Sequence, residues 1–456
     1  MHHTIKYIIC QYKNIFITLL FISLFFSVRW VFVTPQSYNL GEYSDFTTIS
    51  FYLSDILITG LLISYKFPRG IYDSLNNPPA QEENDTKPSN KLYKYSYIIL
   101  IIWLILEIFL NNSAFYSFQT FYSIRWLIIV YVAYETIKFI VSHATFTLQP
   151  ILKGFLFFSF FQGFLAILQF FLQKSLGLYF VGESKILPTM QGVAKIALAD
   201  GVYMRAYGTF PHPNVLGAFL AISLLICSYF LFRSTKLYQT IALTLVYFVN
   251  SLGLLLTFSR AAIIAAIFGI LLLFLTAYLK NKRVPWAKEF IIPTLTFVTL
   301  GLIFSSLIAT RVTISDAASA ERKEYIKIGL AAIKSNPIWG LGVGESVLHM
   351  EQYSGRSLNS WEKQPIHNYF VLAGAELGIP GLLIILFIFF SALKKLFITF
   401  KADNTLTENA LILCILLCFL FLMQFDHYFY TLNQAQLLLW GTLVIIAGIK
   451  NPQKGI

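Results

Sequence analysis

Residues 213–233 read PNVLGAFLAISLLICSYFLFR. Almost every side chain in this run is apolar, and its only charged residue is the arginine at its end. A helix needs about 20 predominantly apolar residues to cross the hydrocarbon core of a bilayer. Pro211 and Pro213 fix the backbone where the run begins, and proline fits the first position of a helix. The stretch therefore predicts a membrane-spanning helix with a defined start.

The composition of the whole chain extends this pattern. Of the 456 residues, 57% are hydrophobic and only 12% are charged, and the mean hydropathy is +0.67. A typical soluble protein has about 25% charged residues, so a cytosolic enzyme, a disordered protein and a secreted disulfide scaffold are excluded. The composition predicts an all-α, polytopic membrane protein. Twelve windows can cross a bilayer: 14–33, 46–65, 95–112, 119–141, 150–172, 213–233, 238–257, 260–279, 289–309, 366–392, 410–428 and the shorter 434–449.

The distribution of Lys and Arg predicts the orientation. The net charge is +12, which in so apolar a chain favours cationic loops facing anionic lipids over a nucleic-acid partner. Most of the Lys and Arg in short loops fall on the side of the N-terminus, for example in 280–288 and 394–401. Cytoplasmic loops carry the excess of positive charge. We therefore expect both termini in the cytoplasm, a multi-pass position in the inner (cytoplasmic) membrane, and the long loops 173–212 and 310–365 outside.

The loop lengths divide the chain into three predicted parts. Residues 1–172 hold the first five helices, 173–392 form a core with the two long outer loops, and 393–456 hold the last helices. The loop 66–94 is polar and carries no residues typical of chemistry. All four cysteines lie in apolar runs, so we expect small hydrophobic side chains and no disulfide or metal site. They are Cys10, Cys227, Cys414 and Cys418.

Two arginines lie beside helix starts on the predicted outer side. Arg205 shortly precedes GTFPHPN at 208–214, which enters the helix quoted above. An arginine next to a helix N-terminus suits an anion. Arg260 lies between two apolar helices with almost no loop between them, where an ionisable residue is costly unless it has a partner or a function. For both arginines, the alternative is a side chain that extends its charged end to the membrane–water interface and takes no part in binding.

The loop 310–365 contains an amphipathic pattern over 321–334. Ile326, Leu330 and Ile333 share one face, and the cationic residues, Arg322 among them, lie off it. We expect a helix that lies along the outer surface, covers a cavity and buries this apolar face.

Glycines follow this helix at alternate positions. Pro337 ends the helix, and Gly340, Gly342 and Gly344 then allow a close approach of the backbone to its neighbours. A dinucleotide-binding fingerprint requires a strand before the glycines. The pattern predicts no such strand, so we expect no dinucleotide site.

His367 lies at the outer mouth of a predicted spanning helix. An imidazole there can take or pass on a proton near neutral pH, and the alternative is a histidine that only caps the helix. Together with Arg205, Arg260 and Arg322, it projects from a separate segment to one side of the membrane. We expect these side chains to converge, which suits a lipid-anchored substrate with an anionic leaving group on the outer face.

With these segments in view, the sequence resembles the O-antigen ligase and polymerase family, bacterial membrane glycosyltransferases that use undecaprenyl-linked glycans. The resemblance covers about 160–390 and does not separate ligases from polymerases. It rests on the order and spacing of five segments: 169–183 with Ser175-Leu176-Gly177-Leu178, Arg205 with 208–214, Ser259-Arg260, 321–344, and 367–381.

The resemblance implies an active site on the periplasmic or outer face and an inverting transfer that needs no metal or cofactor. Arg205 and Arg260 would bind the pyrophosphate of the donor, Arg322 would join them, and His367 would be the general base on the acceptor hydroxyl. The implied partners are an undecaprenyl-pyrophosphate-linked glycan donor, a lipid A core or other glycan acceptor, and membrane lipids.

The chemistry of the residues agrees with these roles. Guanidinium groups match phosphate oxygens bidentately and keep their proton, whereas a metal-dependent site would need clustered carboxylates. Glu42 and Asp45 in the first outside loop do not have that spacing.

Two alternatives to a ligase remain. A polymerase of the same family is one alternative, and a lipid-linked glycan transporter or flippase is another, with Asp55 as its main midplane candidate. Because the polar residues concentrate in outside loops rather than at the midplane, we favour the enzyme.

Overall fold

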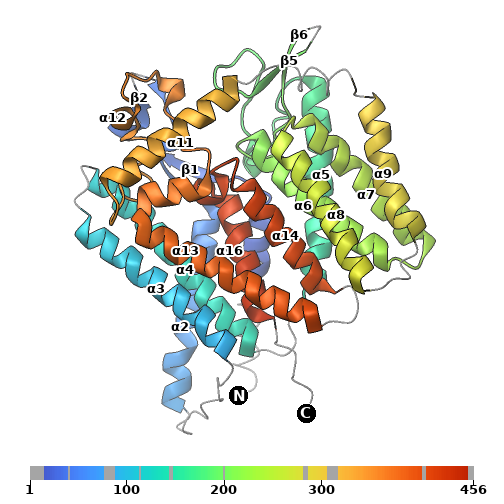
Figure 1. Ribbon diagram of the computed structural model, residues 1–456, viewed down its shortest axis with the longest axis horizontal. Coiled ribbons are helices and arrows are strands. Elements are labelled where there is room, and N and C mark those ends of the chain that lie inside the picture. Colours follow the sequence, from blue (N-terminus) through green and yellow to red (C-terminus); the bar gives the residue numbers. More distant parts are fainter. Residues whose placement is uncertain are drawn as a thin grey trace.

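The structure is a computed structural model that describes residues 15–39, 42–75, 88–111, 115–142, 147–198, 201–280, 286–303, 305, 317–402 and 407–449. Long helices form a bundle, and the short strands with α11 and α12 lie toward its upper end in Figure 1. The bundle helices are α2 (Leu53–Leu75), α3 (Pro88–Leu110), α4 (Tyr116–Ser142), α5 (Gln149–Leu172), α6 (Pro213–Arg233), α7 (Leu237–Leu256), α8 (Arg260–Lys280), α9 (Trp286–Ile303), α13 (Tyr369–Ala402), α14 (Glu408–Leu422) and α16 (Asn433–Gly448). The ends of the chain, whose side of the membrane the sequence predicts, and Cys10 lie outside the described residues.

The apolar helices indicate a multi-pass membrane protein. Among the described residues, five helices are long and apolar enough to cross a membrane: α5, α6, α7, α8 and α13. Shorter apolar helical segments accompany them: Leu53–Ser64, Tyr95–Leu110, Ile291–Leu302 and Glu408–Leu422. Each of the twelve predicted windows contains helical residues. How many of them cross the bilayer stays a prediction.

Small residues let the helices around α6 approach closely. A Cβ added to Gly217 of α6 would lie 2.9 Å from the Cβ of Ala262 in α8. Similarly, a Cβ on Gly253 of α7 would lie 3.0 Å from the Cα of Gly163 in α5. Inside a membrane, where lipid is as apolar as the side chains, such close backbone packing holds helices together. The buried Cys418 of α14 packs in the same way, against Gly269 of α8.

Short strands correct the all-α prediction. β1 (Arg29–Phe32) pairs antiparallel with β4 (Ile49–Tyr52), β2 (Tyr38–Asn39) with β3 (Glu42–Tyr43), and β5 (Lys195–Leu198) with β6 (Gly201–Met204). The predicted window 14–33 is therefore helical only at 15–23 of its described residues, and the window 46–65 becomes helical at Leu53. The apolar residues of 29–33 were counted toward a helix, but after Arg29 the residues WVFV are all aromatic or β-branched and favour a strand.

Two further boundaries differ from the prediction. The polar loop 66–94 is shorter than expected, because α2 continues to Leu75 and α3 begins at Pro88. The window 410–428 is also too long, since α14 ends at Leu422 and the short helix α15 (Tyr428–Thr431) follows after a turn. The turn between them lies at the site described below.

The surface helix predicted over 321–334 is confirmed within α11 (Ala317–Ser335), but its buried face differs. Tyr325 and Ile328 are buried and pack against Met350 of α12 (Met350–Ser354), whereas Leu330 is 54% exposed. The predicted apolar face included only aliphatic residues and therefore left out Tyr325. Its ring can be buried because its hydroxyl donates hydrogen bonds to Glu321 and to the Glu362 carbonyl.

Residues 337–347, which contain the alternate glycines, form a strap that packs against a kink in α13. Gly340 and Gly378 both have positive φ angles, of 69° and 71°. A Cβ on Gly340 would lie 2.3 Å from the Glu376 carbonyl oxygen. Backbone bonds also join the segments, from Leu341 N–H to Ala375 and from Ile379 N–H to Pro337. The close approach predicted from the glycines is therefore confirmed, and it holds the kinked first part of α13, which begins just after His367.

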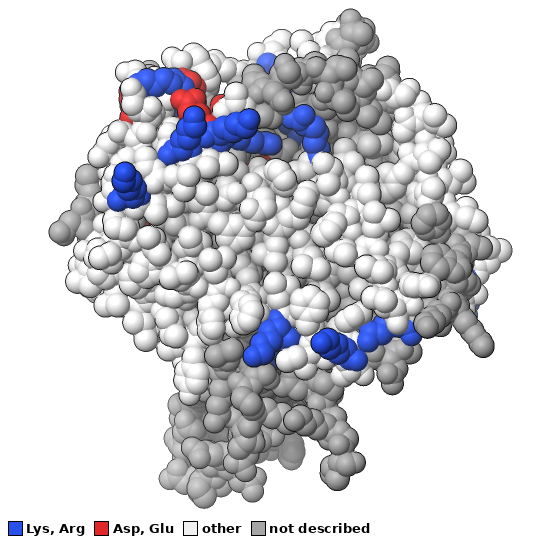
Figure 2. Space-filling view, in the orientation of Figure 1, with Lys and Arg blue, Asp and Glu red and all other residues white. Residues whose placement is uncertain are grey.

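The positions of the charged surface residues match the two interfaces of a bilayer. On the face drawn in Figure 2, Lys and Arg gather at the upper edge over α11 and again near the lower edge, and the described surface between them is white. Exposed lysines at the two levels include Lys323 and Lys334 of α11 and Lys394 and Lys401 of α13. Such an uncharged belt matches a hydrocarbon layer between two polar interfaces.

Candidate active site

All four residues singled out from the sequence line one cavity of about 180 Å³. We call it the arginine cavity, because Arg205, Arg260 and Arg322 line it together with His367. The same cavity is also lined by His212, Asn214, Glu321, Asp426 and Tyr428. The structure thus brings together segments far apart in the chain, and the roles of these residues stay predictions.

Arg205 is held in place from two sides. Its Nε donates to the Thr257 carbonyl at 2.6 Å, and its Nη2 donates to Asn214 Oδ1 at 2.7 Å. The side chain is buried. Asn214 follows the first residue of α6, so the guanidinium is held at the start of this helix, as the 208–214 sequence predicted. Two directional bonds to a planar guanidinium fix its orientation as well as its position.

Arg260 comes from the tight turn between α7 and α8. Phe258 in this turn has a φ of 51°, an uncommon value for a residue other than glycine, and the Ser259 N–H donates to Thr257 Oγ1. Arg260 is the first residue of α8 and its side chain is exposed. Because the Thr257 carbonyl in the same turn binds Arg205, the turn brings both arginines to the same cavity.

The remaining two predicted residues come from the opposite wall. Arg322 lies in α11 and His367 in the segment before α13. The Tyr325 ring of α11 packs against the His367 ring, with centroids 5.6 Å apart. The surface helix therefore borders the cavity, as expected, and supplies its third guanidinium.

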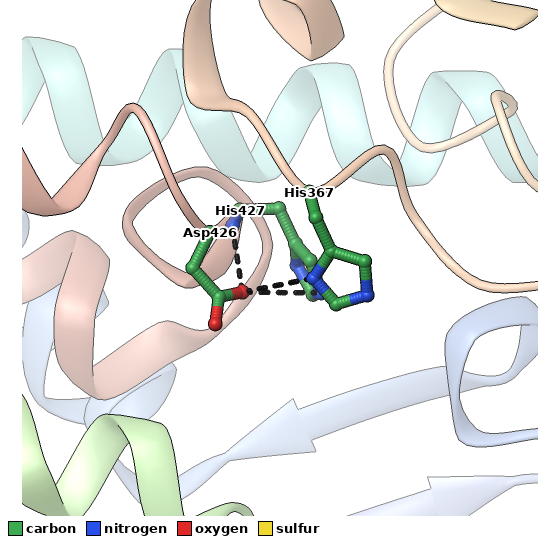
Figure 3. Close-up of side chains that lie close together, drawn as sticks. All are labelled: His367, Asp426 and His427. Atoms are coloured by element: carbon green, nitrogen blue, oxygen red, sulfur yellow. Dashed lines mark hydrogen bonds and ion pairs between the residues drawn. The ribbon is translucent and has the colours of Figure 1, made fainter. Parts of the chain in front are cut away.

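Asp426 is a site residue that the sequence reasoning missed. Its Oδ1 lies 3.3 Å from His367 Nδ1 and accepts the backbone N–H of His427 (Figure 3). Its Oδ2 accepts a hydrogen bond from Asn214 Nδ2 at 2.8 Å. The pair Asp426-His427 was counted as the end of an apolar span over 410–428. Two ionisable residues in succession at the end of such a run were the signal that could have separated them from it.

The carboxylate of Asp426 sits among imidazoles. Burial acts to raise its pKa, but the hydrogen bond and charge of His367 lower it on balance. Burial lowers the pKa of His212 and of His427 to about 3 each. Near neutral pH the centre of the site is therefore one carboxylate anion beside two neutral histidines, in a cavity that three arginines line.

A metal ion could be held by three of these groups. His367, Asp426 and His427 each offer one ligand atom, and these atoms lie within 4.8 Å of one another. His427 Nδ1 bonds to Thr431 Oγ1 at 2.7 Å, which can direct its Nε2 toward Asp426. Asp426 Oδ1, however, already accepts the His427 N–H. The expectation of a site without metal stays a prediction, tested in the Discussion.

Residues 243–386 match the model of the O-antigen ligase family. The chain carries an O-antigen ligase domain. The matched domain is typical of membrane glycosyltransferases of the O-antigen ligase and polymerase type, and the match covers about a third of the chain. The O-antigen ligase domain includes Arg260, Arg322 and His367, whereas Arg205 and Asp426 lie outside the matched range. The search of curated proteins gave no match.

Proposed function

We propose that this protein transfers a glycan from polyprenyl pyrophosphate to an acceptor hydroxyl on the outer face of the cytoplasmic membrane, with inversion and without a metal. It would act as an O-antigen ligase on a lipid A core. The observation that carries the proposal is the convergence of three arginines and a histidine–aspartate pair in the arginine cavity.

The arginines fit the leaving group. When the glycosyl–phosphate bond breaks, its electron pair goes to the pyrophosphate oxygen and negative charge grows there. Arg205 and Arg260 border the cavity beside the start of α6, where backbone N–H groups add positive potential. Fixed guanidinium groups stabilise such developing charge without reorganisation. Arg322 closes the cavity from α11.

His367 fits the role of the general base that accepts the proton of the acceptor hydroxyl. Its Nδ1 faces the Asp426 carboxylate, so the proton on the neutral ring belongs on Nδ1 and the Nε2 lone pair is left for the acceptor hydroxyl. As the hydroxyl oxygen bonds to the anomeric carbon, its proton moves to Nε2. Asp426 then stabilises the imidazolium. A positioned base of this kind contributes about 10²–10⁴ in rate.

Two variants separate these roles. Arg260→Lys keeps the charge but loses the planar fork, so we expect about tenfold weaker donor binding, equivalent to about 1.4 kcal/mol. His367→Ala should retain donor binding and lower transfer by about 10²–10⁴. Both are measured with purified protein in lipid nanodiscs and the lipid-linked glycan.

Matched controls lie outside the arginine cavity. Arg356→Lys makes the same change at an arginine paired with Glu324 and Glu362, and His349→Ala does so at a histidine paired with Glu345. Neither should change donor binding or transfer. Normal transfer by His367→Ala would make this histidine a cap, and normal binding by Arg260→Lys would make the arginine an interfacial anchor.

A gene deletion distinguishes the ligase from a polymerase of the same family. With a ligase, the deletion removes long chains from lipid A while the lipid-linked polymer remains. With a polymerase, polymer is lost while one repeat unit is still attached to lipid A. Gel electrophoresis of the surface glycans and of the lipid-linked pool reports both.

The contacts of Asp55 give little support to a transporter. This residue was the main midplane candidate, but it lies in the first turn of α2, where its Oδ2 accepts the Tyr52 N–H and its Oδ1 pairs with Arg125 Nε at 3.2 Å. A backbone hydrogen bond at the start of a helix and an ion pair to a neighbouring helix are both typical of a structural residue.

A further inference from the structure

A second, larger cavity adjoins the arginine cavity. Its volume is about 280 Å³, and it shares His212, His367, Asp426 and Tyr428 with the arginine cavity. Its other walls come from the N-terminal strands, α4, the 343–347 segment of the strap and α16. His367 therefore stands between two chambers rather than at the end of one.

The second cavity is built for an uncharged ligand. Two arginines line it, but Arg29 pairs with Asp45 at 2.9 Å, and Arg125 binds both Asp55 and Asn433. Aromatic side chains make up much of the remaining wall. They include Phe46, Tyr52, Tyr122 and Trp126. Aromatic faces beside a few placed polar groups suit a sugar ring, which has apolar C–H faces and a rim of hydroxyls.

Gln436 of α16 lines this cavity and also has an unmet acceptor. Its Nε2 donates to the Tyr430 carbonyl, whereas its Oε1 is buried and has no hydrogen-bond partner among the described residues. Only 3% of the residue is exposed, and it lines the second cavity. A buried acceptor left without a donor costs about 1–3 kcal/mol. A ligand that brings a hydroxyl into the cavity would remove this cost.

Stereochemistry decides which substrate belongs here, given the transfer proposed above. In an inverting displacement the hydroxyl oxygen attacks the anomeric carbon opposite the leaving oxygen. The carbon–oxygen bond to the acceptor forms as the bond to pyrophosphate breaks, the electron pair leaves with the phosphate, and the acceptor proton goes to His367. With the pyrophosphate among the arginines, the acceptor hydroxyl lies across the anomeric carbon from them and beside His367, and the second cavity is the space that opens at His367.

We propose that the second cavity binds the sugar of the acceptor that carries the attacking hydroxyl, and that Gln436 accepts a hydrogen bond from one of its hydroxyls. The proposal rests on the proposed function and gives a role to Gln436 and Phe46, which no sequence motif pointed to. Phe46 forms part of the same sugar-binding wall and lies edge-on to His427, with ring centroids 5.8 Å apart.

The test compares two glutamines of one helix. Gln436→Leu removes the acceptor atom while keeping the size of the side chain. Gln434→Leu makes the same change two residues away, where both side-chain polar atoms are also buried without a partner but the residue is not among those that line either cavity. Transfer is measured against acceptor concentration in nanodiscs, with donor binding measured separately.

Two probe acceptors cover the two forms of the reaction. One is purified lipid A core, and the other is the repeat-unit glycan on an alkyl anchor that lacks pyrophosphate and so cannot act as a donor. With the acceptor that the parent protein uses, we expect Gln436→Leu to raise the acceptor KM about tenfold, the loss of about 1.4 kcal/mol. Donor binding should stay unchanged, and Gln434→Leu should behave as the parent does.

A second variant guards against loss of folding. Phe46 is half-buried, so Phe46→Ala should leave the bundle folded, and it should raise the acceptor KM as well. An unchanged acceptor KM in either folded variant, or a change confined to donor binding, would overturn the acceptor site. If the parent transfers glycan to neither probe, the proposed function itself is wrong, which is a different outcome.

Discussion

Asp426 joins the predicted base to the predicted phosphate-binding side of the arginine cavity. One carboxylate oxygen faces His367 Nδ1, and the other accepts from Asn214, which in turn accepts from Arg205. A single side chain thus orients the imidazole and supports the residue that holds the buried guanidinium. Its position between the two groups allows their contributions to be separated by substitution.

We expect Asp426→Asn to lower kcat far more than it raises the donor KM. The amide keeps the size and can still accept from Asn214, but it carries no charge to stabilise the imidazolium and can donate to Nδ1, which favours the wrong tautomer. Most of the base's contribution of about 10²–10⁴ should be lost. Asn214→Ala should show the opposite split, because it loosens Arg205 and leaves the His367–Asp426 pair. Equal effects of both variants on KM and kcat would show that Asp426 only maintains the fold.

Chelators should leave transfer unchanged. A cation held by the three groups would bind His367 through Nδ1, which fixes the proton on Nε2 and prevents that atom from acting as a base. Metal binding and the proposed role of His367 therefore exclude each other. We expect full activity after treatment with EDTA and inhibition by added Zn²⁺. Activity that is lost on chelation and restored by one particular cation would instead make the cluster a catalytic metal site.

At the level of elements, the strap of alternate glycines holds the kink in the first part of α13. Its conformation depends on residues without side chains, because the strap backbone lies against the backbone of the α13 kink. The carboxylate of Glu376 adds to this, accepting the N–H groups of Gly344 and Ser346. Since His367 lies just before α13, errors in the strap should reach the site.

Gly340→Ala should destabilise the protein well beyond the cost of its backbone angle. The φ of 69° costs an alanine about 1–2 kcal/mol, and its Cβ would also lie 2.3 Å from the Glu376 carbonyl oxygen. Gly355→Ala is the matched control, with a φ of 71° and no atom within 4 Å of its Cβ. The temperature of half-unfolding in nanodiscs should fall much more for Gly340→Ala. An equal fall for both would mean that the strap can yield.

The sequence predictions succeeded where the residues that determine an element lie within that element. The window 213–233 matched α6 at both ends, because prolines, a long apolar run and a final arginine all act within the segment. The convergence of Arg205, Arg260 and His367 was also expected, since each lies at a helix mouth. Asp426 and Gln436 could not be singled out, because their significance comes from neighbours distant in sequence. For Asp426 these include His367 and Asn214.

On the scale of the whole molecule, the site draws on every predicted part of the chain. Arg29 and Trp126 come from 1–172, Arg205 and His367 from 173–392, and Gln436 from 393–456. The division into three parts stays a prediction, but the second cavity is lined by residues from all three, and the arginine cavity by residues from the last two. A matched family range over 243–386 therefore contains the domain's signature without containing the complete site.

The orientation of the molecule can be tested at two exposed positions. Ser335 ends α11, at the level of the strap and the two cavities, and Lys401 lies near the far end of α13. The excess of Lys and Arg predicts that the first is outside and the second cytoplasmic. Cys227, Cys414 and Cys418 are buried, so with Cys10 changed to serine a new thiol at either position gives the main signal.

We expect a membrane-impermeant maleimide to label Ser335→Cys in intact spheroplasts or protoplasts, and Lys401→Cys only after the membrane is opened. This outcome places both cavities on the outer side, where a lipid-linked glycan already moved across the membrane can reach the arginines. The opposite pattern would put the arginine cavity in the cytoplasm. The positive charge near Lys401 would then face outward, against the rule that orients membrane proteins, and the proposed outer-face transfer would have to be abandoned even if the residues act chemically as described.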